Sequence, residues 1–427
     1  MSYMLVKGGS PLRGKVEISG AKNAVLPLAC LGLLTDQSLV LNRVPAISDV
    51  AIMDHLLQAV GASVVRNGAS MCLSTTSIKT SVVNAEYAKK IRASVVLMGA
   101  LLARHGHVDF PLPGGCGLST TSRAIDYHLS GFQALGACIE PSNSCVRVTA
   151  PKGRMDGGTY TFPQPSLTGT INVVLAAVLA KGASALHNIS VEPEVLAVIQ
   201  CLQAMGAIIE RDASSLYIQG TDRLTGALYN VPCDRIEMGT YMVASAMTQG
   251  DVTIIGDCID ALDSPIHLLR EMGACIDRID GTTVRVRMTQ RPECGHLTTG
   301  PFPLFPTDLQ APFLALMCIA KGRSTVKETI WDNRFMHVAE LRKMGACIDI
   351  NGNTATIVGQ DHLVPNTVHA TDLRTGFSLI LAGLVARGHS QVHNIFHLDR
   401  GYEDAERKLS NCGACIQRVM ESDVQRA

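Results

Sequence analysis

Apolar stretches with helical spacing alternate along this chain with short strand-like stretches, and one junction between them recurs six times. At each junction Gly-Ala is followed by one small or apolar residue and then by valine or isoleucine. The six glycines are 67 to 75 residues apart, and they are Gly61, Gly136, Gly206, Gly273, Gly345 and Gly413. This period is too long for a solenoid and fits a duplicated supersecondary unit. The 427 residues therefore predict six copies of one α/β unit, divided most simply into two domains of three.

Two finer features of the pattern predict local structure. Several apolar runs end in a polar residue and a glycine before a strand, and these glycines are expected to cap helices: Gly182, Gly250, Gly322 and Gly388. Four cysteines directly follow the Gly-Ala pair, and they are Cys138, Cys275, Cys347 and Cys415. We expect these cysteines to act as small apolar residues that open buried strands.

Charge and cysteine content exclude several classes of protein. The 37 basic and 37 acidic side chains leave no net charge, which argues against nucleic acid or an anionic membrane as the main partner. The longest apolar stretches, such as residues 24–34, are shorter than a membrane span, and the amino terminus is strand-like, so a soluble, cytoplasmic protein is expected. Fourteen cysteines in such a chain do not predict disulfides, and the pair Cys412 and Cys415 lacks the second pair that a metal site needs.

Most predicted units carry a polar or charged cluster where a long helix begins. The clusters are residues 19–23, 92–94, 166–170, 234–237, 307–310 and 371–374. Helix capping explains their serine, threonine and aspartate, but not four cations that the helix dipole disfavours there, Lys22, Arg92, Arg235 and Arg374. A bound anion or an acidic neighbour would explain the cations. If equivalent helices are parallel, their positive ends could meet at one interdomain cleft suited to an anionic ligand.

One segment breaks the apolar period. Residues 112–123 are rich in glycine, serine and threonine and predict an exposed, mobile loop. Cys116 and Arg123 lie in this loop. A thiol flanked by glycines and near cations could have a lowered pKa and be reactive, whereas the alternative is an incidental surface cysteine.

Six motifs spread over the chain resemble one known family, the UDP-N-acetylglucosamine 1-carboxyvinyltransferases, which are enolpyruvyl transferases. The motifs are Ile18-Ser-Gly-Ala-Lys-Asn-Ala24, Leu112-Pro-Gly-Gly-Cys116, Phe305-Pro-Thr-Asp-Leu-Gln310, Asn333-Arg-Phe-Met-His337, Ala370-Thr-Asp-Leu-Arg374 and Asp399-Arg-Gly-Tyr-Glu403. They occur in the family's order. The related enolpyruvylshikimate-phosphate synthases share the six-unit architecture but lack the cysteine loop.

The resemblance implies a fold and a reaction. The fold is a two-domain inside-out α/β barrel of six repeat units, with domains at residues 22–232 and at 1–21 joined with 233–427. The active site is expected in the cleft between them. The reaction is the first committed step of peptidoglycan synthesis, in which the 3-hydroxyl of UDP-N-acetylglucosamine adds to phosphoenolpyruvate and the tetrahedral ketal then expels phosphate. Neither a metal nor a cofactor is required.

The resemblance also implies roles for individual residues. The catalytic set is Cys116, Asp308, Lys22 and Arg400, with Cys116 as the acid that protonates C3 and the target of fosfomycin-type epoxides, and Asp308 as the base. The cations implied for phosphoenolpyruvate are Lys22, Arg92, Arg123, Arg334, Arg374 and Arg400. The residues implied for the acceptor are Asn23, Arg123, Asp126, Ser166 and Asp308.

Three departures from the family's pattern leave the acceptor open. Six residues separate Cys116 from Arg123, which is a longer loop than the family's, and Tyr127 and Gln164 replace an aliphatic residue and a lysine. All three changes fall where the uridine diphosphate is expected. One alternative is therefore a paralogue with another nucleotide acceptor, such as uridine monophosphate, and a second is a non-catalytic binder of UDP-sugars. The oligomeric state is not indicated by the sequence.

Overall fold

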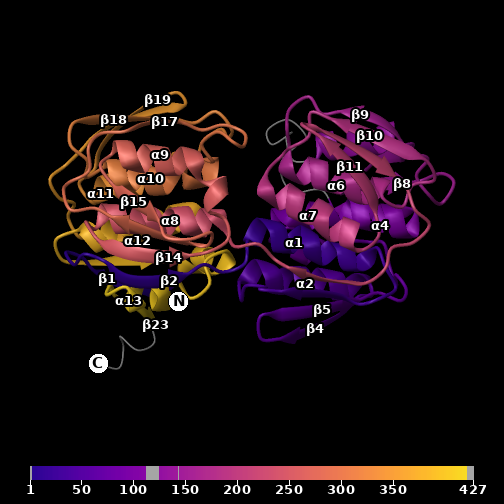
Figure 1. Cartoon of the computed structure of the whole chain (residues 1–427), viewed down its shortest axis with the longest axis horizontal. Coiled ribbons are helices and arrows are strands. Elements are labelled where there is room, and N and C mark those ends of the chain that lie inside the picture. Colours follow the sequence, from indigo (N-terminus) through magenta and orange to yellow (C-terminus); the bar gives the residue numbers. More distant parts are fainter. Residues whose placement is uncertain (1, 112–124, 143, 421–427) are drawn as a thin grey trace. The chain divides into compact units, whose positions relative to one another are not determined.

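The computed structural model describes residues 2–111, 125–142 and 144–420. Two compact units divide the chain: Met1–Ser19 with Cys233–Ala427, called here the split unit, and Gly20–Pro232, called the inserted unit (Figure 1). The chain thus begins in the split unit with strands β1 (Ser2–Lys7) and β2 (Arg13–Glu17), builds the whole inserted unit, and then returns.

Three sheets of four strands lie in the described part of the split unit. Their strand orders are β21 (Thr367–His369), β22 (His389–His393), β1, β23 (Cys415–Met420); β15 (Cys275–Arg278), β16 (Thr283–Arg287), β14 (Asp251–Ile255), β2; and β17 (His296–Thr298), β18 (Arg323–Lys327), β20 (Thr354–Val358), β19 (Cys347–Asn351). Along each order, one parallel pair and two antiparallel pairs occur.

The described part of the inserted unit also has three sheets. Their orders are β11 (Ile208–Asp212), β12 (Ser215–Gln219), β10 (Ala183–His187), β9 (Gly158–Thr161); β13 (Ala227–Asn230), β3 (Leu39–Asn42), β5 (Ser70–Ser74), β4 (Ser63–Asn67); and β6 (His107–Pro111), β8 (Cys145–Thr149), β7 (Cys138–Pro141). The two four-stranded sheets have the same one parallel and two antiparallel pairs. In the three-stranded sheet an isolated parallel bridge from Val82 to Asp109 stands where the missing parallel strand would pair.

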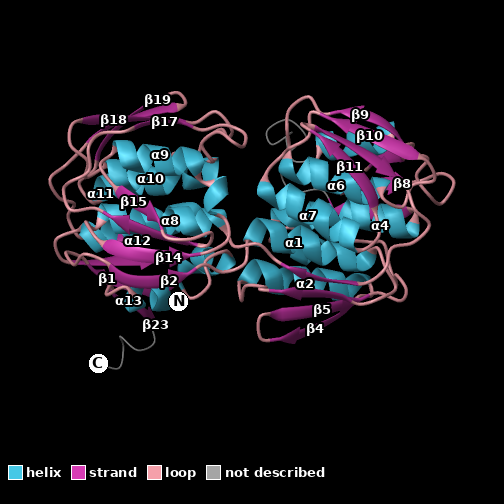
Figure 2. Ribbon diagram, in the orientation of Figure 1, coloured by secondary structure: helices cyan, strands magenta, loops and turns pink. Residues whose placement is uncertain are grey.

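Buried helices lie inside each unit, and strands lie around them, while other helices such as α9 (Asp263–Glu271) keep an exposed face (Figure 2). The α-helices of the split unit are α8 (Arg235–Met247), α9 (Asp263–Glu271), α10 (Gln310–Met317), α11 (Val338–Lys343), α12 (Leu373–Val385) and α13 (Ala405–Asn411). Those of the inserted unit are α1 (Lys22–Cys30), α2 (Ser48–Val60), α3 (Ala85–Ala88), α4 (Leu97–His105), α5 (Asp126–Ala134), α6 (Leu167–Ala177) and α7 (Pro193–Ala204). Helices α8, α10 and α12 pack against one another and are buried almost all round, as expected for helices enclosed by other elements.

The recurring Gly-Ala junction has a structural reason. Gly61 is the left-handed C-cap of α2, and Gly136, Gly206, Gly273 and Gly345 have φ between 86° and 101° just after a helix. A left-handed residue ends a helix at little cost only when it lacks a Cβ atom. The prediction that the glycines of the second pattern cap helices was wrong. Helices α6, α8 and α12 end at Ala177, Met247 and Val385, several residues before Gly182, Gly250 and Gly388.

The prediction for the cysteines after Gly-Ala was also wrong. Cys138, Cys275, Cys347 and Cys415 are exposed. In a strand, successive side chains point to opposite faces. The alanine and the isoleucine on either side of Cys275, Ala274 and Ile276, are 6% and 7% exposed, so the intervening cysteine must face solvent.

No helix in the described part of the chain is both long and apolar enough to span a membrane.

Candidate functional site

One aspartate of the split unit is held by two arginines. Asp308 lies in a single 3₁₀ turn (Thr307–Leu309) that leads into α10. Its Oδ1 accepts a hydrogen bond of 2.9 Å from Nη2 of Arg334, and its Oδ2 accepts bonds of 2.9 and 3.2 Å from Nη2 and Nε of Arg374. Three motifs that are far apart in the sequence therefore meet at one carboxylate, and the structure brings together three of the predicted site residues.

Arg374 is a cation at a helix start, and its surroundings explain why it is tolerated there. Asp372 caps α12 through a capping box with Thr375, which satisfies the first amides of the helix without the arginine. The guanidinium of Arg374 is 6% exposed and lies 5.5 Å from the centre of the Tyr402 ring. Its Nη1 has no hydrogen-bond partner among the described residues. An acidic neighbour, Asp308, therefore stabilises this cation, with one donor still available.

Arg400 closes a 3₁₀ helix (Ile395–Arg400) that follows β22. His397 lies in the same turn, and its pKa is lowered by partial burial and by the charge of Arg400. The side chain of the neighbouring Asp399 is bound to β23, where Arg418 donates to both of its carboxylate oxygens at 2.6 and 2.9 Å. Asp399 is thus bound to the sheet, whereas the neighbouring Arg400 lies at the end of the turn.

A buried ionic network that the sequence analysis missed lies near the start of α8. Nζ of Lys408 donates to Glu237 Oε1 and to Ser19 Oγ, both at 2.6 Å. The backbone amide of Ser19 donates to the other Glu237 oxygen at 2.8 Å, and the Ser19 hydroxyl donates to Glu403. Burial raises the pKa of Glu237, whereas Lys408 opposes that shift. The network fixes Ser19, the last residue of the split unit before the chain leaves it.

In the inserted unit, Lys22 opens α1 and forms an ion pair with Asp49 on α2, with Nζ 2.8 Å from Oδ2. The carboxylate is 2% exposed and the lysine 12%. Asn23 follows as the second residue of the helix and is partly exposed. An acidic neighbour was one of the two explanations that the sequence offered for a lysine at this position, and Asp49 is that neighbour.

Arg92 begins a 3₁₀ helix (Arg92–Val96) and acts on a buried histidine. His128 on α5 is 1% exposed, and burial together with the charge of Arg92 lowers its pKa to about 3. The amide nitrogen of Asn172, on α6, lies 2.8 Å from Nδ1 of His128. Because that nitrogen can only donate, His128 is neutral with its proton on Nε2.

The remaining acceptor candidates lie at two helix starts. Asp126 is the first residue of α5 and is exposed, and Tyr127 next to it is partly buried. Ser166 caps α6, because its hydroxyl accepts from the amide of Gly169 at 3.2 Å. Gln164, two residues earlier, is exposed. Capping accounts for the position of Ser166 among the described residues.

Two predicted site residues, Cys116 and Arg123, lie outside the described residues. Arg235, which the sequence singled out as a fourth cation at a helix start, is 5% exposed and lies 5.7 Å from the centre of the Phe302 ring. Within residues 2–111, 125–142 and 144–420, no three His, Cys, Asp or Glu side chains are placed to hold a metal ion.

Comparison with known proteins identifies the family. A sequence profile described as EPSP synthase (3-phosphoshikimate 1-carboxyvinyltransferase) matches residues 6–409. Proteins named UDP-N-acetylglucosamine 1-carboxyvinyltransferase from Xylella fastidiosa strains M23 and 9a5c are each 44% identical, with 98% of this chain and 100% of the relative covered.

Solved structures agree on the fold. The enolpyruvyl transferase NikO from Streptomyces tendae has a TM-score of 0.89 at 22% identity, with 98% of this chain and 99% of that chain covered. An EPSP synthase from Acinetobacter baumannii has a TM-score of 0.76 at 16% identity, with 98% and 100% covered. At these identities the structures support the fold alone. The sequence relatives and the profile go further, and the chain therefore belongs to the UDP-N-acetylglucosamine 1-carboxyvinyltransferase family of enolpyruvyl transferases.

Proposed function

We propose that this enzyme transfers the enolpyruvyl group of phosphoenolpyruvate to the 3-hydroxyl of UDP-N-acetylglucosamine and releases phosphate, the first committed step of peptidoglycan synthesis. The observation that carries the proposal is the Asp308 carboxylate held by Arg334 and Arg374 in a chain 44% identical to proteins of that name. The cluster supplies a base for the acceptor hydroxyl and two cations for the anionic enol phosphate. The acid that the addition also needs is assigned below.

The reaction divides into two balanced steps. In the first, the acceptor oxygen bonds to C2 of phosphoenolpyruvate, its proton goes to a base, and C3 gains a proton from an acid. In the second, the bond between C2 and the phosphate oxygen breaks and C3 loses a proton. We assign Asp308 as the base and Cys116 as the acid. These steps need no phosphoryl transfer, because the phosphorus–oxygen bonds stay intact.

The cations fall into two groups, one for the phosphate and one for the carboxylate of phosphoenolpyruvate. We assign Lys22, Arg123 and Arg400 to the phosphate, Arg334 and Arg374 to the carboxylate, and Arg92 to support of the Cys116 loop. The support in the described residues is that Arg374 is buried with Nη1 unpaired, and that Arg334 and Arg374 already bind an anionic group, Asp308. A ligand carboxylate can replace such a contact with similar geometry. We assign Asn23, Arg123, Asp126, Ser166 and Asp308 to the acceptor.

The architecture proposed for this activity is the two-domain inside-out α/β barrel of six repeat units. Its support is the shared pairing of the five four-stranded sheets, one parallel pair and two antiparallel pairs, around buried helices. We take the split and inserted units as its two domains. Small-molecule substrates are the partners that this activity requires.

The acceptor proposed here is preferred to another nucleotide because relatives named for UDP-N-acetylglucosamine are 44% identical over 98% of the chain. A non-catalytic role is disfavoured because Asp308 and the cations around it are retained.

Isotope incorporation tests the proposed chemistry directly. With phosphoenolpyruvate and UDP-N-acetylglucosamine in deuterium oxide, addition places a deuteron on C3 and elimination removes a proton or a deuteron. The expected product therefore carries deuterium in its vinyl group, seen by NMR as reduced vinyl proton intensity, and Cys116→Ser is expected to abolish its formation. A product formed without any deuterium at C3 would exclude addition–elimination.

A further inference from the structure

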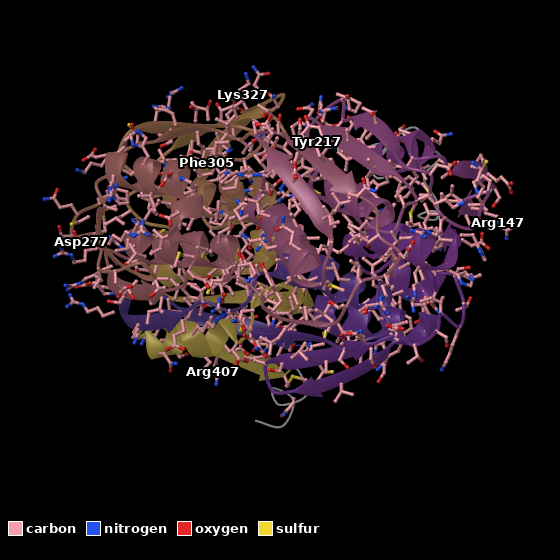
Figure 3. All side chains as sticks on the ribbon, turned by 45° about the vertical axis from the view of Figure 1, so that its right-hand side comes forward. Arg147, Tyr217, Asp277, Phe305, Lys327 and Arg407 are labelled. Carbon is pink, nitrogen blue, oxygen red and sulfur yellow. The ribbon has the colours of Figure 1, made fainter. Side chains whose placement is uncertain are left out.

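One buried carboxylate, which is not part of the site described above, connects the two segments that carry Asp308 and Arg334. Glu328 directly follows β18, whose last residue, Lys327, is labelled in Figure 3. Glu328 is 2% exposed and belongs to none of the residues assigned above. Four hydrogen-bond donors surround its two oxygens, and it forms no ion pair with any residue that the structure describes.

The first oxygen holds the segment that leads to Arg334. Oε1 accepts from the backbone amides of Ile330 at 2.7 Å and Trp331 at 3.1 Å, and from the hydroxyl of Thr299 at 2.9 Å. Arg334 follows Trp331 by three residues. These contacts fix the start of the loop from which Arg334 reaches Asp308.

The second oxygen holds the segment that carries Asp308. Oε2 accepts from the hydroxyl of Thr307 at 2.9 Å. Thr307 is the first residue of the single 3₁₀ turn in which Asp308 is the second. One side chain thus ties both partners of the ion pair between Asp308 and Arg334, whose N–O distance is 2.9 Å.

We propose that Glu328 is a positioning residue for enolpyruvyl transfer, setting the distance between the base Asp308 and the cation Arg334. This inference rests on the function proposed above. A carboxylate suits the task because it accepts at both oxygens and has no donor to conflict with two amides and two hydroxyls. Its burial keeps water from competing for these donors.

The substitution Glu328→Gln distinguishes geometry from charge. The amide oxygen of glutamine can occupy the Oε1 position and keep three donors, and its nitrogen can donate to Thr307, whose hydroxyl also accepts. Glu328→Ala loses all four bonds. If position is what matters, glutamine rescues most of what alanine loses. If Glu328 acted through its charge or by proton transfer, both variants would fail alike.

The expected effects are large enough to measure. For Glu328→Ala we expect kcat/KM for phosphate release to fall about 100-fold, the order of loss that a displacement of about 1 Å causes. Glu328→Gln should stay within about fivefold of wild type, since it can keep every contact. Thr307→Val, which removes only the Oε2 contact, should lower kcat by about tenfold, the equivalent of about 1.4 kcal/mol.

Trp331 provides a readout that does not need activity. It is the only tryptophan in the chain, and its amide is bound by Glu328. Quenching of its fluorescence by acrylamide should increase in Glu328→Ala and stay unchanged in Thr307→Val, because that variant leaves Oε1 intact. The control is Glu293→Gln, which removes the carboxylate of a half-exposed ion pair with Lys321 and should change neither activity nor quenching.

The outcomes separate this inference from the proposed function. If the wild-type protein releases no phosphate, the proposed function fails, while unchanged quenching in folded Glu328→Ala would still overturn the anchoring of the loop. If the wild type is active, wild-type kcat/KM in Glu328→Ala would overturn the positioning role. Equal losses in Glu328→Gln and Glu328→Ala would also overturn it. If Glu328→Ala does not fold, Thr307→Val decides, and unchanged kcat there contradicts the proposal.

Discussion

Replacing Asp308 by asparagine should have opposite effects on substrate binding and on turnover. The side chain keeps its shape, but it loses its charge and one of its acceptor oxygens. In the free enzyme the carboxylate accepts one hydrogen bond from Arg334 and two from Arg374. It is therefore an internal anion that occupies cations assigned here to the substrate. On this assignment, phosphoenolpyruvate displaces part of these contacts when it binds.

The size of both effects follows from the geometry. A hydrogen bond to a charged group contributes about 1.5 to 3 kcal/mol, and partial exposure places these bonds near the low end of that range. If binding exchanges about one such bond, its removal in advance should tighten phosphoenolpyruvate binding by about 1 to 2 kcal/mol, or about 5- to 30-fold. Turnover should fall about 100- to 10,000-fold, since a general acid or base contributes that much.

Two measurements on the same variant test this reasoning. Phosphate release gives turnover, and titration calorimetry with phosphoenolpyruvate gives the dissociation constant. The matched control is Asp277→Asn, which breaks an exposed carboxylate–arginine pair with Arg287 at 2.6 Å and should change neither quantity (Figure 3). Wild-type turnover in Asp308→Asn would refute its role as the base. Weaker binding of phosphoenolpyruvate would refute the view that Asp308 competes with the substrate.

Two further predictions concern stability. Lys408→Met should lower the free energy of unfolding by about 3 to 5 kcal/mol at pH 8 because it leaves the buried carboxylate of Glu237 without its cation. The loss should shrink at pH 5, where protonation removes that charge, and urea titrations showing equal losses at both pH values would contradict it. Burial lowers the pKa of His128 to about 3 and of His337 to about 4, so the unfolded chain takes up protons below pH 6.5 that the folded chain cannot. Each histidine should therefore lower the free energy of unfolding by about 2 kcal/mol as the pH falls from 6.5 to 5. Urea titrations of His128→Gln should show about half of this pH dependence.

The repeat and the family could be predicted from the sequence because both depend on local patterns. Each Gly-Ala junction needs a glycine in the left-handed conformation where a helix ends. The same local sequence therefore recurs in every copy. The exposure of Cys275 was mispredicted because a hydrophobic neighbourhood was taken to mean burial. The period of two along a strand, with Ala274 and Ile276 buried, would have placed that cysteine in solvent.

The site was predictable only in part. The sequence showed that cations at helix starts need an anion, but it could not show that Asp308 serves Arg374 from 66 positions away or that Asp49 serves Lys22. Such pairs depend on tertiary packing rather than on local propensity. Glu328 was missed for the same reason, since four of its contacts come from three separate segments and its own position at a strand end carries no motif.

Acceptor choice is the most direct test of the central claim, and it can be measured as phosphate release from phosphoenolpyruvate with UDP-N-acetylglucosamine, with uridine monophosphate and with neither. Cys116→Ser is the control for the assigned chemistry. We expect turnover with UDP-N-acetylglucosamine, none with the monophosphate or without acceptor, and none in the variant. The function proposed here would be contradicted by turnover with the monophosphate but not with UDP-N-acetylglucosamine. It would also be contradicted if neither acceptor supported turnover.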